Sequence, residues 1–318
     1  MSHRRIPSPS PRLRRCLLAV PASSMKMMTK ALTTDADAVF LDLEDAVSAG
    51  EKVSARQTAI TAINELDWHG HGKTISLRVN GLDTNWTVGD LVDVLGATQG
   101  KLDTVILPKV GSAEDLYAID VIATQIAGGQ GGAPVGLEAL IETAQGAANL
   151  HDIAQYNRSI GANRLEAMHF GAGDYAASVH ARTTEIGGLN PDYPGDQWHG
   201  IVSQLVAHCR ANGIIPMDSA FGDFKDEAGY LASARRATAI GFNGKWAIHP
   251  SQIALANQVF SPSEDELKDA KAIIKALEDG AKEGKGAVQY NGKMIDMASE
   301  RMARAMLHVQ KTIDGKKP

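Results

Sequence analysis

Two short apolar runs in the middle of the chain each lead to an acidic residue. Ala-Leu-Ile-Glu-Thr over residues 139–143 carries Glu142, and Phe-Gly-Ala-Gly-Asp-Tyr-Ala-Ala-Ser over residues 170–178 carries Asp174. In a parallel α/β barrel, the carboxyl ends of the strands hold the catalytic groups. Two carboxylates from neighbouring strand ends, completed by substrate and water oxygens, suit a hard cation such as Mg²⁺, and Mn²⁺ accepts the same ligands. We therefore predict that Glu142 and Asp174 bind a metal ion, which in turn holds a small 2-oxo acid.

Polar side chains also follow most of the other apolar runs. They are Asp42, Glu44, Asp45, Arg78, Asn80, Lys109, Asp218 and His249. The interior of a barrel is filled by apolar layers, so polar residues that gather at one rim are not packing material. One alternative is a salt-bridged rim without any ligand, in which Arg78 and Lys109 neutralise four acids, namely Glu44, Asp45, Glu142 and Asp174. We favour a bound cation, because several acids at one mouth repel one another and a divalent ion removes that repulsion.

Eight apolar or β-rich runs alternate with segments of helical periodicity. The runs cover residues 16–21, 38–45, 75–80, 104–110, 135–143, 166–174, 214–221 and 244–250. Near-continuous apolar strands separated by helices indicate parallel strands that are buried on both faces. Eight such units predict a (β/α)₈ TIM barrel, and no Gly-rich dinucleotide-binding motif follows the first strand to favour an open sheet.

The pattern changes after the eighth predicted strand. A helix is expected over residues 263–282 with Ser263 as its N-cap, and a last helix runs to about residue 312. We therefore predict three parts: a flexible basic arm over residues 1–14, the barrel over residues 15–262, and a C-terminal helix and lid over residues 263–318. This tail could cover a barrel mouth or reach a neighbouring subunit.

The bulk properties exclude several classes of protein. The chain has 318 residues and a net charge of -5, whereas a nucleic-acid-binding protein normally carries a basic patch. No apolar run approaches the ~20 residues of a membrane-spanning helix, and no signal-peptide core follows the basic N-terminus. Cys16 and Cys209 lie in apolar runs and suggest neither a disulfide framework nor a zinc site. We expect a cytoplasmic protein without nucleic-acid or membrane partners.

Eight segments together carry a resemblance to a known family. They are Phe40-Leu-Asp-Leu-Glu-Asp-Ala-Val47, Leu77-Arg-Val-Asn-Gly-Leu-Asp83, Ile106-Leu-Pro-Lys-Val-Gly111, Leu140-Ile-Glu-Thr-Ala144, Phe170-Gly-Ala-Gly-Asp-Tyr-Ala-Ala-Ser178, Phe221-Gly-Asp-Phe224, Gly244-Lys-Trp-Ala-Ile-His-Pro250 and Asn291-Gly-Lys-Met-Ile-Asp296. The chain resembles the malyl-CoA lyase/β-methylmalyl-CoA lyase group, within the citrate lyase β-subunit-like family of CoA-ester lyases. The resemblance covers nearly the whole chain, and it implies a TIM barrel of the phosphoenolpyruvate/pyruvate type with a C-terminal helical lid.

The resemblance implies a catalytic role for four residues. Glu142 and Asp174 match the family's two Mg²⁺ ligands, and Arg78 matches an arginine that faces the thioester carbonyl. Asp296 matches a lid aspartate that enters the active site of a neighbouring subunit and acts as acid and base. Two further residues match acids that sit behind the metal and order its waters, namely Glu44 and Asp45.

The resemblance also implies a set of substrate-binding residues. Lys30 matches a lysine that contacts CoA, while Ala19 and Ser24 fall in the region that lines its adenine and phosphates. The remaining positions fall where backbone or side chains meet the substrate, and they are Arg78, Gly173, Asp174, Ile248 and His249. The implied partners are a CoA thioester, glyoxylate and further copies of the chain, as a trimer or hexamer that exchanges its lids.

The implied reaction is a reversible retro-Claisen cleavage. L-malyl-CoA would give acetyl-CoA and glyoxylate, and β-methylmalyl-CoA would give propionyl-CoA and glyoxylate. Arg78 would place a permanent positive charge where the enolate oxygen develops, and Asp296 would protonate the enolate carbon. Three alternatives remain open: a malyl-CoA thioesterase, a citramalyl-CoA or citryl-type lyase, and a degenerate barrel that serves as an oligomeric interaction subunit. The intact site residues speak against the last.

Overall fold

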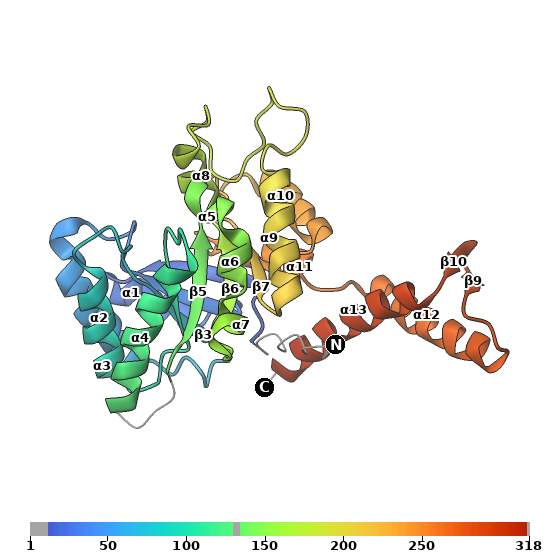
Figure 1. Cartoon of the computed structure of the whole chain (residues 1–318), viewed down its shortest axis with the longest axis horizontal. Helices are drawn as coiled ribbons and strands as arrows, with labels where there is room; N and C mark the ends of the chain where they lie inside the picture. Colours follow the sequence, from blue (N-terminus) through green and yellow to red (C-terminus); the bar gives the residue numbers. More distant parts are fainter. Residues whose placement is uncertain (1–11, 130–133, 317–318) are drawn as a thin grey trace. The chain divides into compact units, whose positions relative to one another are not determined.

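Eight parallel strands close into a barrel. The computed structural model describes residues 12–129 and 134–316. The strands are β1 (Cys16–Pro21), β2 (Ala38–Asp42), β3 (Thr74–Arg78), β4 (Thr104–Leu107), β5 (Gly136–Ile141), β6 (Leu165–Phe170), β7 (Ile215–Asp218) and β8 (Gly244–Ala247). Each strand pairs with the next along the chain, and β8 pairs with β1 to complete the ring. Figure 1 labels β3, β5, β6 and β7 of this barrel. The predicted (β/α)₈ barrel is therefore confirmed.

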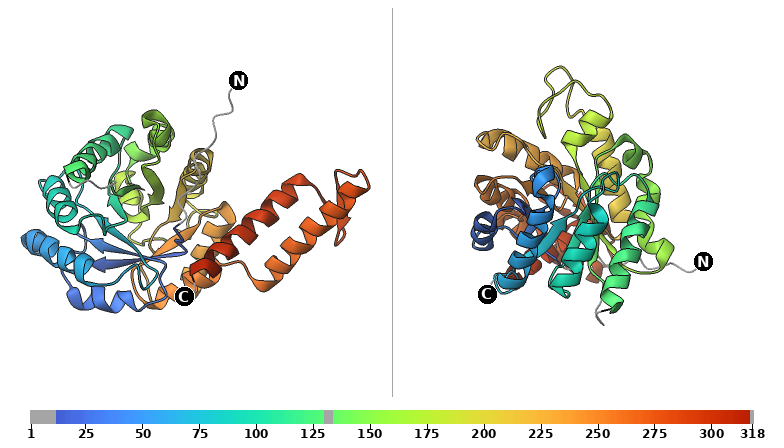
Figure 2. Two further views of the ribbon diagram at one scale, coloured as in Figure 1. Left: turned by 90° about the horizontal axis from the view of Figure 1, so that it is seen from below. Right: turned by 90° about the vertical axis from the view of Figure 1, so that its left-hand side faces the viewer.

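Helices cover the outside of the barrel, as the left-hand view of Figure 2 shows. They are α1 (Met25–Leu32), a 3₁₀ turn at Ala49–Glu51, α2 (Lys52–Glu65), α3 (Thr87–Thr98), α4 (Ala113–Gly129), α5 (Ala144–Ala148), α6 (Leu150–Ala154), α7 (Tyr156–Ile160), α8 (Ala172–Ser178), α9 (His199–Asn212), α10 (Glu227–Ile240) and α11 (Ser251–Val259). Inside the ring, side chains from seven strands form one buried cluster. It comprises Leu17, Ala38, Phe40, Ile106, Leu140, Ala167, Ile215, Met217 and Trp246. This apolar floor lies beneath the polar rim that the sequence predicted.

Several strands end earlier than the apolar runs suggest, and one correction affects the site. We expected Asp174 at the end of a strand, but β6 ends at Phe170 and Asp174 lies in the first turn of α8. The run stays apolar because Ala172 and Ala176 are buried on that helix. Hydrophobicity alone does not separate a buried strand from a buried helical turn, so the run gave no sign of the boundary.

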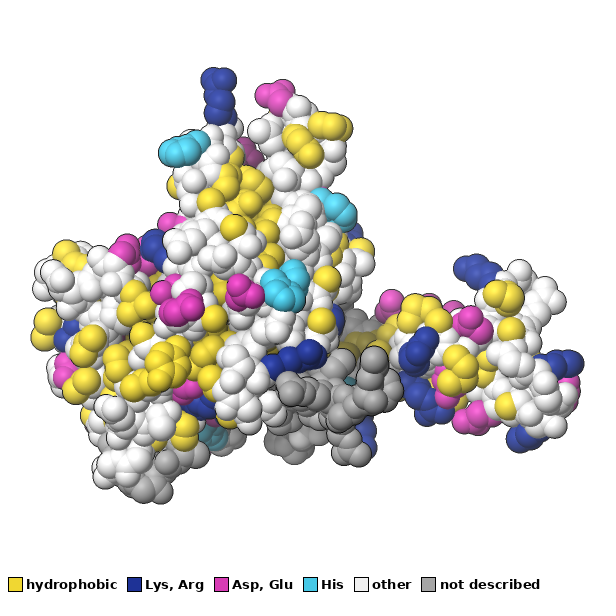
Figure 3. Space-filling model, in the orientation of Figure 1, with side chains coloured by type: hydrophobic (Ala, Val, Ile, Leu, Met, Phe, Trp, Pro, Cys, Tyr) yellow, Lys and Arg dark blue, Asp and Glu magenta, His cyan; other side chains and the backbone are white. Residues whose placement is uncertain are grey.

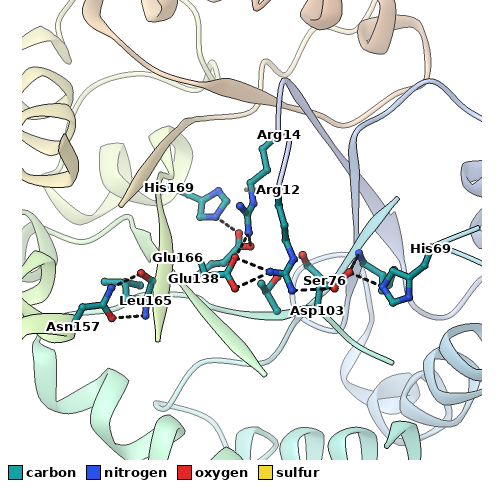
Figure 4. Close-up of polar contacts among 12 residues, drawn as sticks. Arg12, Arg14, His69, Ser76, Asp103, Glu138, Asn157, Leu165, Glu166 and His169 are labelled. Atoms are coloured by element: carbon teal, nitrogen blue, oxygen red, sulfur yellow. Dashed lines mark hydrogen bonds and ion pairs between the residues drawn. The ribbon is translucent and has the colours of Figure 1, made fainter. Parts of the chain in front are cut away.

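The predicted basic arm of residues 1–14 also needs a correction at its end. Residues 1–11 lie outside the described residues, but Arg12 and Arg14 are held by ion pairs. Arg14 Nη2 donates to Glu138 Oε1 at 2.8 Å, and Arg12 Nη1 donates to Glu166 Oε1 at 3.0 Å (Figure 4). Both acids come from strands, which the sequence run of basic residues could not reveal.

By its internal contacts the chain divides into two compact units, Met1–Asn257 and Gln258–Pro318. The second unit contains α12 (Glu264–Lys282), β9 (Val288–Tyr290), β10 (Lys293–Ile295) and α13 (Met297–Lys316). Ser263 caps α12 through a reciprocal capping box with Glu266, which confirms the predicted start of this helix. The functional boundary at residue 262 and the action of this unit as a lid stay predictions.

The outer surface carries scattered apolar side chains, which Figure 3 shows in yellow over the helices at the left. Exposed examples are Val88, Val92, Tyr117 and Val121. Single apolar residues are common on protein surfaces and need no special function. Within the described residues, no helix combines the length and apolar character that crossing a membrane requires.

The seam between β8 and β1 allows a test of the fold. A Cβ at Gly244 would lie 1.7 Å from the carbonyl oxygen of Arg14, whereas a Cβ at the exposed Gly200 would meet nothing within 4 Å. We expect Gly244→Ala to lower the free energy of unfolding by roughly 2 kcal/mol or more, because backbone must move to admit the methyl group. Gly200→Ala, in α9, should raise it by up to about 1 kcal/mol. Urea unfolding followed by circular dichroism measures both, and equal stabilities for the two variants would contradict the described closure.

Candidate active site

Arg78 is fixed by a two-point ion pair at the barrel mouth. Its Nε donates to Asp42 Oδ1 at 2.8 Å, and its Nη2 donates to Asp42 Oδ2 at 2.7 Å. The two residues are direct neighbours at the ends of β2 and β3. Burial alone would lower the pKa of Arg78, but Asp42, Glu44 and Asp45 raise it well above its usual value. The guanidinium is therefore a permanent charge in a fixed orientation.

Glu44 connects Arg78 to Lys109 across the mouth. Arg78 Nη1 lies 2.9 Å from Glu44 Oε2, and the Lys109 ammonium contacts the other carboxylate oxygen. Asp45, whose side chain is 59% exposed, lies 3.2 Å from the same Nη1. Lys109 itself adopts a left-handed backbone conformation, with φ of 54°. This unusual conformation brings both its side chain and its backbone N–H into the site.

Glu142 directly follows β5 and is only 2% exposed. Its Oε1 accepts a hydrogen bond from the backbone N–H of Lys109 at 2.9 Å. Burial and then the charges of Glu44 and Asp174 raise the pKa of Glu142 to about 8, although Arg78 and the Lys109 hydrogen bond oppose the rise. Gly171 makes the room for this carboxylate, since a Cβ there would lie 2.4 Å from Glu142 Oε2. The site thus holds a buried carboxylate that lacks full compensation.

The arrangement of charges fits a divalent cation. In the described part of the chain, neither Glu142 nor Asp174 forms an ion pair, because Arg78 and Lys109 are paired with Asp42, Glu44 and Asp45. The salt-bridged rim that we considered as an alternative therefore exists, but it leaves these two acids without an ion pair. No group of three or more His, Cys, Asp or Glu side chains suited to a metal occurs among the described residues. A hard cation here would take two protein carboxylates and complete its shell with other oxygens.

The predicted substrate-binding residues lie in several settings. Ala19 packs on the buried cluster of the barrel, and Ser24 caps α1 by accepting from the Met27 N–H at 3.3 Å. Lys30 is exposed in the last turn of α1. Gly173 lies in α8 beside Asp174.

The two residues after β8 lie at its carboxyl end. Ile248 is 41% exposed, and its N–H donates to Gln252 Oε1 at 2.8 Å. The His249 ring stacks on Phe224 with centroids 4.6 Å apart and contacts Ser251 Oγ through Nδ1 at 2.9 Å. Both residues therefore lie on the rim, held by local contacts.

Asp296 belongs to the second compact unit, where it begins α13. Its carboxylate Oδ1 accepts from the backbone N–H of Ala298 at 2.8 Å and of Ser299 at 3.3 Å. The preceding hairpin turns at Asn291 and Gly292, which both have positive φ. Asp296 is therefore the N-terminal cap of α13, and it remains partly exposed.

Sequence reasoning missed the central role of Asp42. We noted it only as a strand end, yet it accepts two hydrogen bonds from Arg78 and two from the backbone N–H groups of Glu44 and Ala46. Its place two residues before Glu44 was the available signal, because Asp side chains commonly accept from backbone N–H groups two residues onward. Lys52 was also missed, and it donates from α2 to the carbonyl oxygens of Leu43 and Glu44.

Asp218 lies outside this constellation although it ends β7. Its Oδ2 lies 2.6 Å from the ammonium of Lys245, which is fully buried and 5.8 Å from the ring centroid of Tyr230 on α10. This pair faces the helices and not the mouth, so we assign it to packing between barrel and helical layer.

A closed parallel barrel with a fixed arginine and buried acids at the carboxyl ends of its strands has the architecture of a barrel enzyme. The chain belongs to the HpcH/HpaI aldolase/citrate lyase family, whose sequence profile matches residues 15–250. The family groups aldolases with citrate lyases. This membership confirms the prediction of a carbon–carbon lyase, and it also confirms the resemblance that the motifs indicated.

Individual relatives are similar over most of the chain. An L-malyl-CoA/β-methylmalyl-CoA lyase of Cereibacter sphaeroides is 42% identical, with 96% of this chain and 98% of the relative covered. A (3S)-malyl-CoA thioesterase of Cereibacter sphaeroides is 35% identical, with 89% of each chain covered. The crystal structure of protein CitE from Mycobacterium tuberculosis with magnesium, acetoacetate and coenzyme A is 27% identical. It has a TM-score of 0.76 and covers 95% of this chain and 100% of its own.

The raised pKa of Glu142 leads to a testable prediction about stability. Its pKa of about 8 lies above the ordinary value of 4.5, so the folded protein retains a proton that the unfolded chain releases between these pH values. The stability of the metal-free protein therefore falls as pH rises through this window. We expect Glu142→Gln to melt several degrees higher than the parent at pH 8 without metal, and close to it at pH 5.

The matched control is Glu283→Gln, which alters an exposed glutamate of the second unit and should leave both melting temperatures unchanged. Added Mg²⁺ should raise the melting temperature of the parent and not that of Glu142→Gln. A metal-free Glu142→Gln protein that melts below the parent at pH 8 would show that the carboxylate is compensated within the protein.

Proposed function

We propose that this chain is a magnesium-dependent CoA-ester lyase. It cleaves L-malyl-CoA to acetyl-CoA and glyoxylate, and β-methylmalyl-CoA to propionyl-CoA and glyoxylate, and it runs both reactions in reverse. The observation that carries the proposal is the presence, at one barrel mouth, of a fixed, permanently charged Arg78 and a buried Glu142 that forms no ion pair within the described residues. The 42% identity to an L-malyl-CoA/β-methylmalyl-CoA lyase supports the choice of substrates.

Glu142 and Asp174 would hold the metal ion. The fit rests on their chemistry, since both offer hard oxygen donors and neither is neutralised by a side chain in the described residues. When bound, Mg²⁺, or Mn²⁺ in its place, would supply Lewis acidity toward the oxygens of the 2-hydroxy acid. Glu44 and Asp45 would order the waters around this position, because they project from the adjacent loop beside Arg78.

Arg78 stabilises the charge that appears when the carbon–carbon bond breaks. The substrate hydroxyl gives its proton to water, and the bond between its carbon and the thioester α-carbon breaks. The electron pair of that bond passes to the thioester as an enolate, while the hydroxyl carbon becomes the aldehyde. The enolate oxygen then faces a guanidinium that Asp42 already holds in place, so no reorganisation is needed as the charge develops. The released aldehyde is glyoxylate.

Asp296 protonates the enolate carbon and removes a methyl proton in the synthetic direction. It arrives from the lid of a neighbouring subunit in a homo-oligomer, either a trimer or a hexamer. The partial exposure of Asp296 at the start of α13 supports this role. The protein works in the cytoplasm and binds neither nucleic acid nor membrane.

The CoA part of the substrate would lie along β1 and α1. Ala19, Ser24 and Lys30 would contact it there, and Lys30 is the exposed basic residue in the last turn of α1. Gly173, Ile248 and His249 would meet the acyl part at the carboxyl ends of the barrel, beside Asp174. These assignments follow the motif matches.

A thioesterase is the second candidate, favoured by the 35% identity to a (3S)-malyl-CoA thioesterase. Such an enzyme would hydrolyse the thioester and spare the carbon–carbon bond. A citramalyl-CoA or citryl-type lyase would keep the same bond cleavage with a more substituted substrate. An interaction subunit without activity would not need an uncompensated carboxylate.

The product balance tests the proposal. With Mg²⁺ present, loss of malyl-CoA should yield acetyl-CoA and glyoxylate in equal amounts, and EDTA should abolish the reaction until Mg²⁺ or Mn²⁺ is restored. Glu142→Ala and Asp174→Ala should each lose this activity and keep the circular dichroism spectrum of the parent. Free CoA without acetyl-CoA would assign the chain as a thioesterase, and comparison of malyl-, β-methylmalyl- and citramalyl-CoA ranks the acyl groups.

Complementation tests the lid assignment. Asn is also a good N-cap, so Asp296→Asn keeps the cap of α13 and removes only the acid. Asp296→Asn and Glu142→Ala should each be nearly inactive as homo-oligomers. After subunit exchange in equal amounts, roughly a quarter of the parent activity should return, because some sites combine an intact barrel with an intact neighbouring lid.

The control for this experiment is Asp265→Asn, which changes an exposed acid in the first turn of α12 and should retain full activity. Subunit exchange is verified separately by mass labelling. If no activity returns after complete exchange, Asp296 does not act across subunits.

A further inference from the structure

Two aromatic rings form the surface on which Arg78 lies. The guanidinium carbon is 5.6 Å from the ring centroid of Phe40 and 5.6 Å from that of Trp246. The two rings touch one another, with centroids 4.6 Å apart, and both belong to the buried cluster of the barrel. Asp42 holds the edge of the guanidinium through hydrogen bonds. The two rings contact its face and so limit the tilt of its plane.

The orientation of Trp246 is set by a hydrogen bond inside the barrel. Its indole N–H donates to Nδ1 of His169 at 2.9 Å. An indole nitrogen is a donor only, so this ring nitrogen of His169 must accept and cannot carry a proton. The proton of the neutral imidazole therefore lies on Nε2, and the structure defines the tautomer from its hydrogen bonds.

His169 is in turn fixed from the other side. Its Nε2 lies 2.6 Å from Glu138 Oε2, and Glu138 Oε1 accepts from Arg14 at 2.8 Å (Figure 4). The side chains of these three residues are fully buried. The polar chain thus runs from the segment before β1, across β5 and β6, to the indole of β8.

Packing alone does not account for this series of hydrogen-bonded side chains. An apolar side chain at position 169 would fill the same interior space without a desolvation cost, and buried polar groups are costly unless each is paired. A tryptophan ring has a broad, roughly two-fold preference about its second side-chain torsion. The bond from the indole to His169 selects one of these orientations, and the selected ring is the one that contacts Arg78.

We propose that Trp246 and His169 are positioning residues for Arg78. His169 holds the indole in one orientation, and the indole face holds the guanidinium plane in the direction that the enolate oxygen requires. The proposal rests on the proposed function in one respect, namely that Arg78 faces the thioester. Neither Trp246 nor His169 needs to touch the substrate.

The first test removes only the indole N–H and part of the ring. Trp246→Phe should lower kcat about tenfold and leave KM for malyl-CoA within about twofold, because a tilted guanidinium loses more in the transition state than in the ground state. The matched control is Trp68→Phe. Trp68 is 2% exposed, and its indole N–H donates to the Ala62 carbonyl at 3.0 Å, so this variant loses a comparable buried bond far from Arg78.

A second readout does not depend on activity. In ¹H–¹⁵N spectra of the arginine Nε–H groups, the Arg78 signal is identified by its loss in Arg78→Lys. That signal should shift or broaden in Trp246→Phe and stay in place in Trp68→Phe. If the Arg78 signal does not move in Trp246→Phe, the positioning role is wrong, whatever reaction the enzyme catalyses. If the signal moves but the parent protein has no lyase activity, the positioning role stands and only the proposed function is rejected.

Variants of His169 separate positioning from general destabilisation. His169→Gln keeps an acceptor and a donor, whereas His169→Leu keeps neither. In His169→Leu the Trp246 N–H loses its acceptor and Glu138 Oε2 loses its contact with the ring, while Glu138 Oε1 keeps its bond from Arg14. We expect His169→Leu to reproduce the kcat loss and the shifted Arg78 signal, and His169→Gln to recover a large part of both. If His169→Leu melts at a lower temperature but retains the parent kcat and Arg78 signal at a temperature where it is folded, His169 is structural only.

Discussion

The two-point ion pair between Arg78 and Asp42 is the interaction on which the mouth of the barrel depends. It joins the ends of two adjacent strands at directly paired positions, so strand register alone brings its partners together. The same Asp42 carboxylate accepts the N–H groups of Glu44 and Ala46, which fixes the loop that carries the next two acids. One carboxylate therefore sets both the direction of the arginine and the path of the loop. A lysine in place of Arg78 could not form the paired fork.

The ion pair between Arg78 and Asp42 also determines which acids of the mouth remain free to bind a cation. Arg78 and Lys109 are the cations of the mouth, and they are engaged by Asp42, Glu44 and Asp45. Glu142 receives a backbone N–H and no ion pair within the described residues, and burial together with its acidic neighbours raises its pKa. An ion pair between one of these cations and Glu142 would stabilise the protein. Its absence lowers the stability of the metal-free protein and raises the affinity of the site for a cation, and such a loss of stability is common at functional sites.

The sequence predicted the barrel and the identity of most mouth residues because both follow from simple patterns. Eight apolar runs separated by helices admit few folds, and strand ends of parallel strands meet at one rim. It could not predict where β6 ends, since the buried first turn of α8 continues the apolar run to Asp174. It also missed the partner of Arg78, because Asp42, Glu44 and Asp45 lie within four residues and only the strand register selects Asp42. The buried bond between Trp246 and His169 joins positions 77 residues apart, a separation that no local pattern records.

A buried network of hydrogen bonds inside the barrel converges on Glu138. This carboxylate accepts from Arg14 on one side and from His169 on the other, and His169 in turn accepts from the indole N–H of Trp246. Beyond the indole the contact changes from a hydrogen bond to the face of a ring, which is the kind of contact that a guanidinium accepts while its edge is used elsewhere. The edge of Arg78 is then set by Asp42 and its face by Trp246, two constraints that act in different planes. A charge meant to meet a developing enolate needs both, because a fork held only at its edge can still tilt about the line that joins it to Asp42.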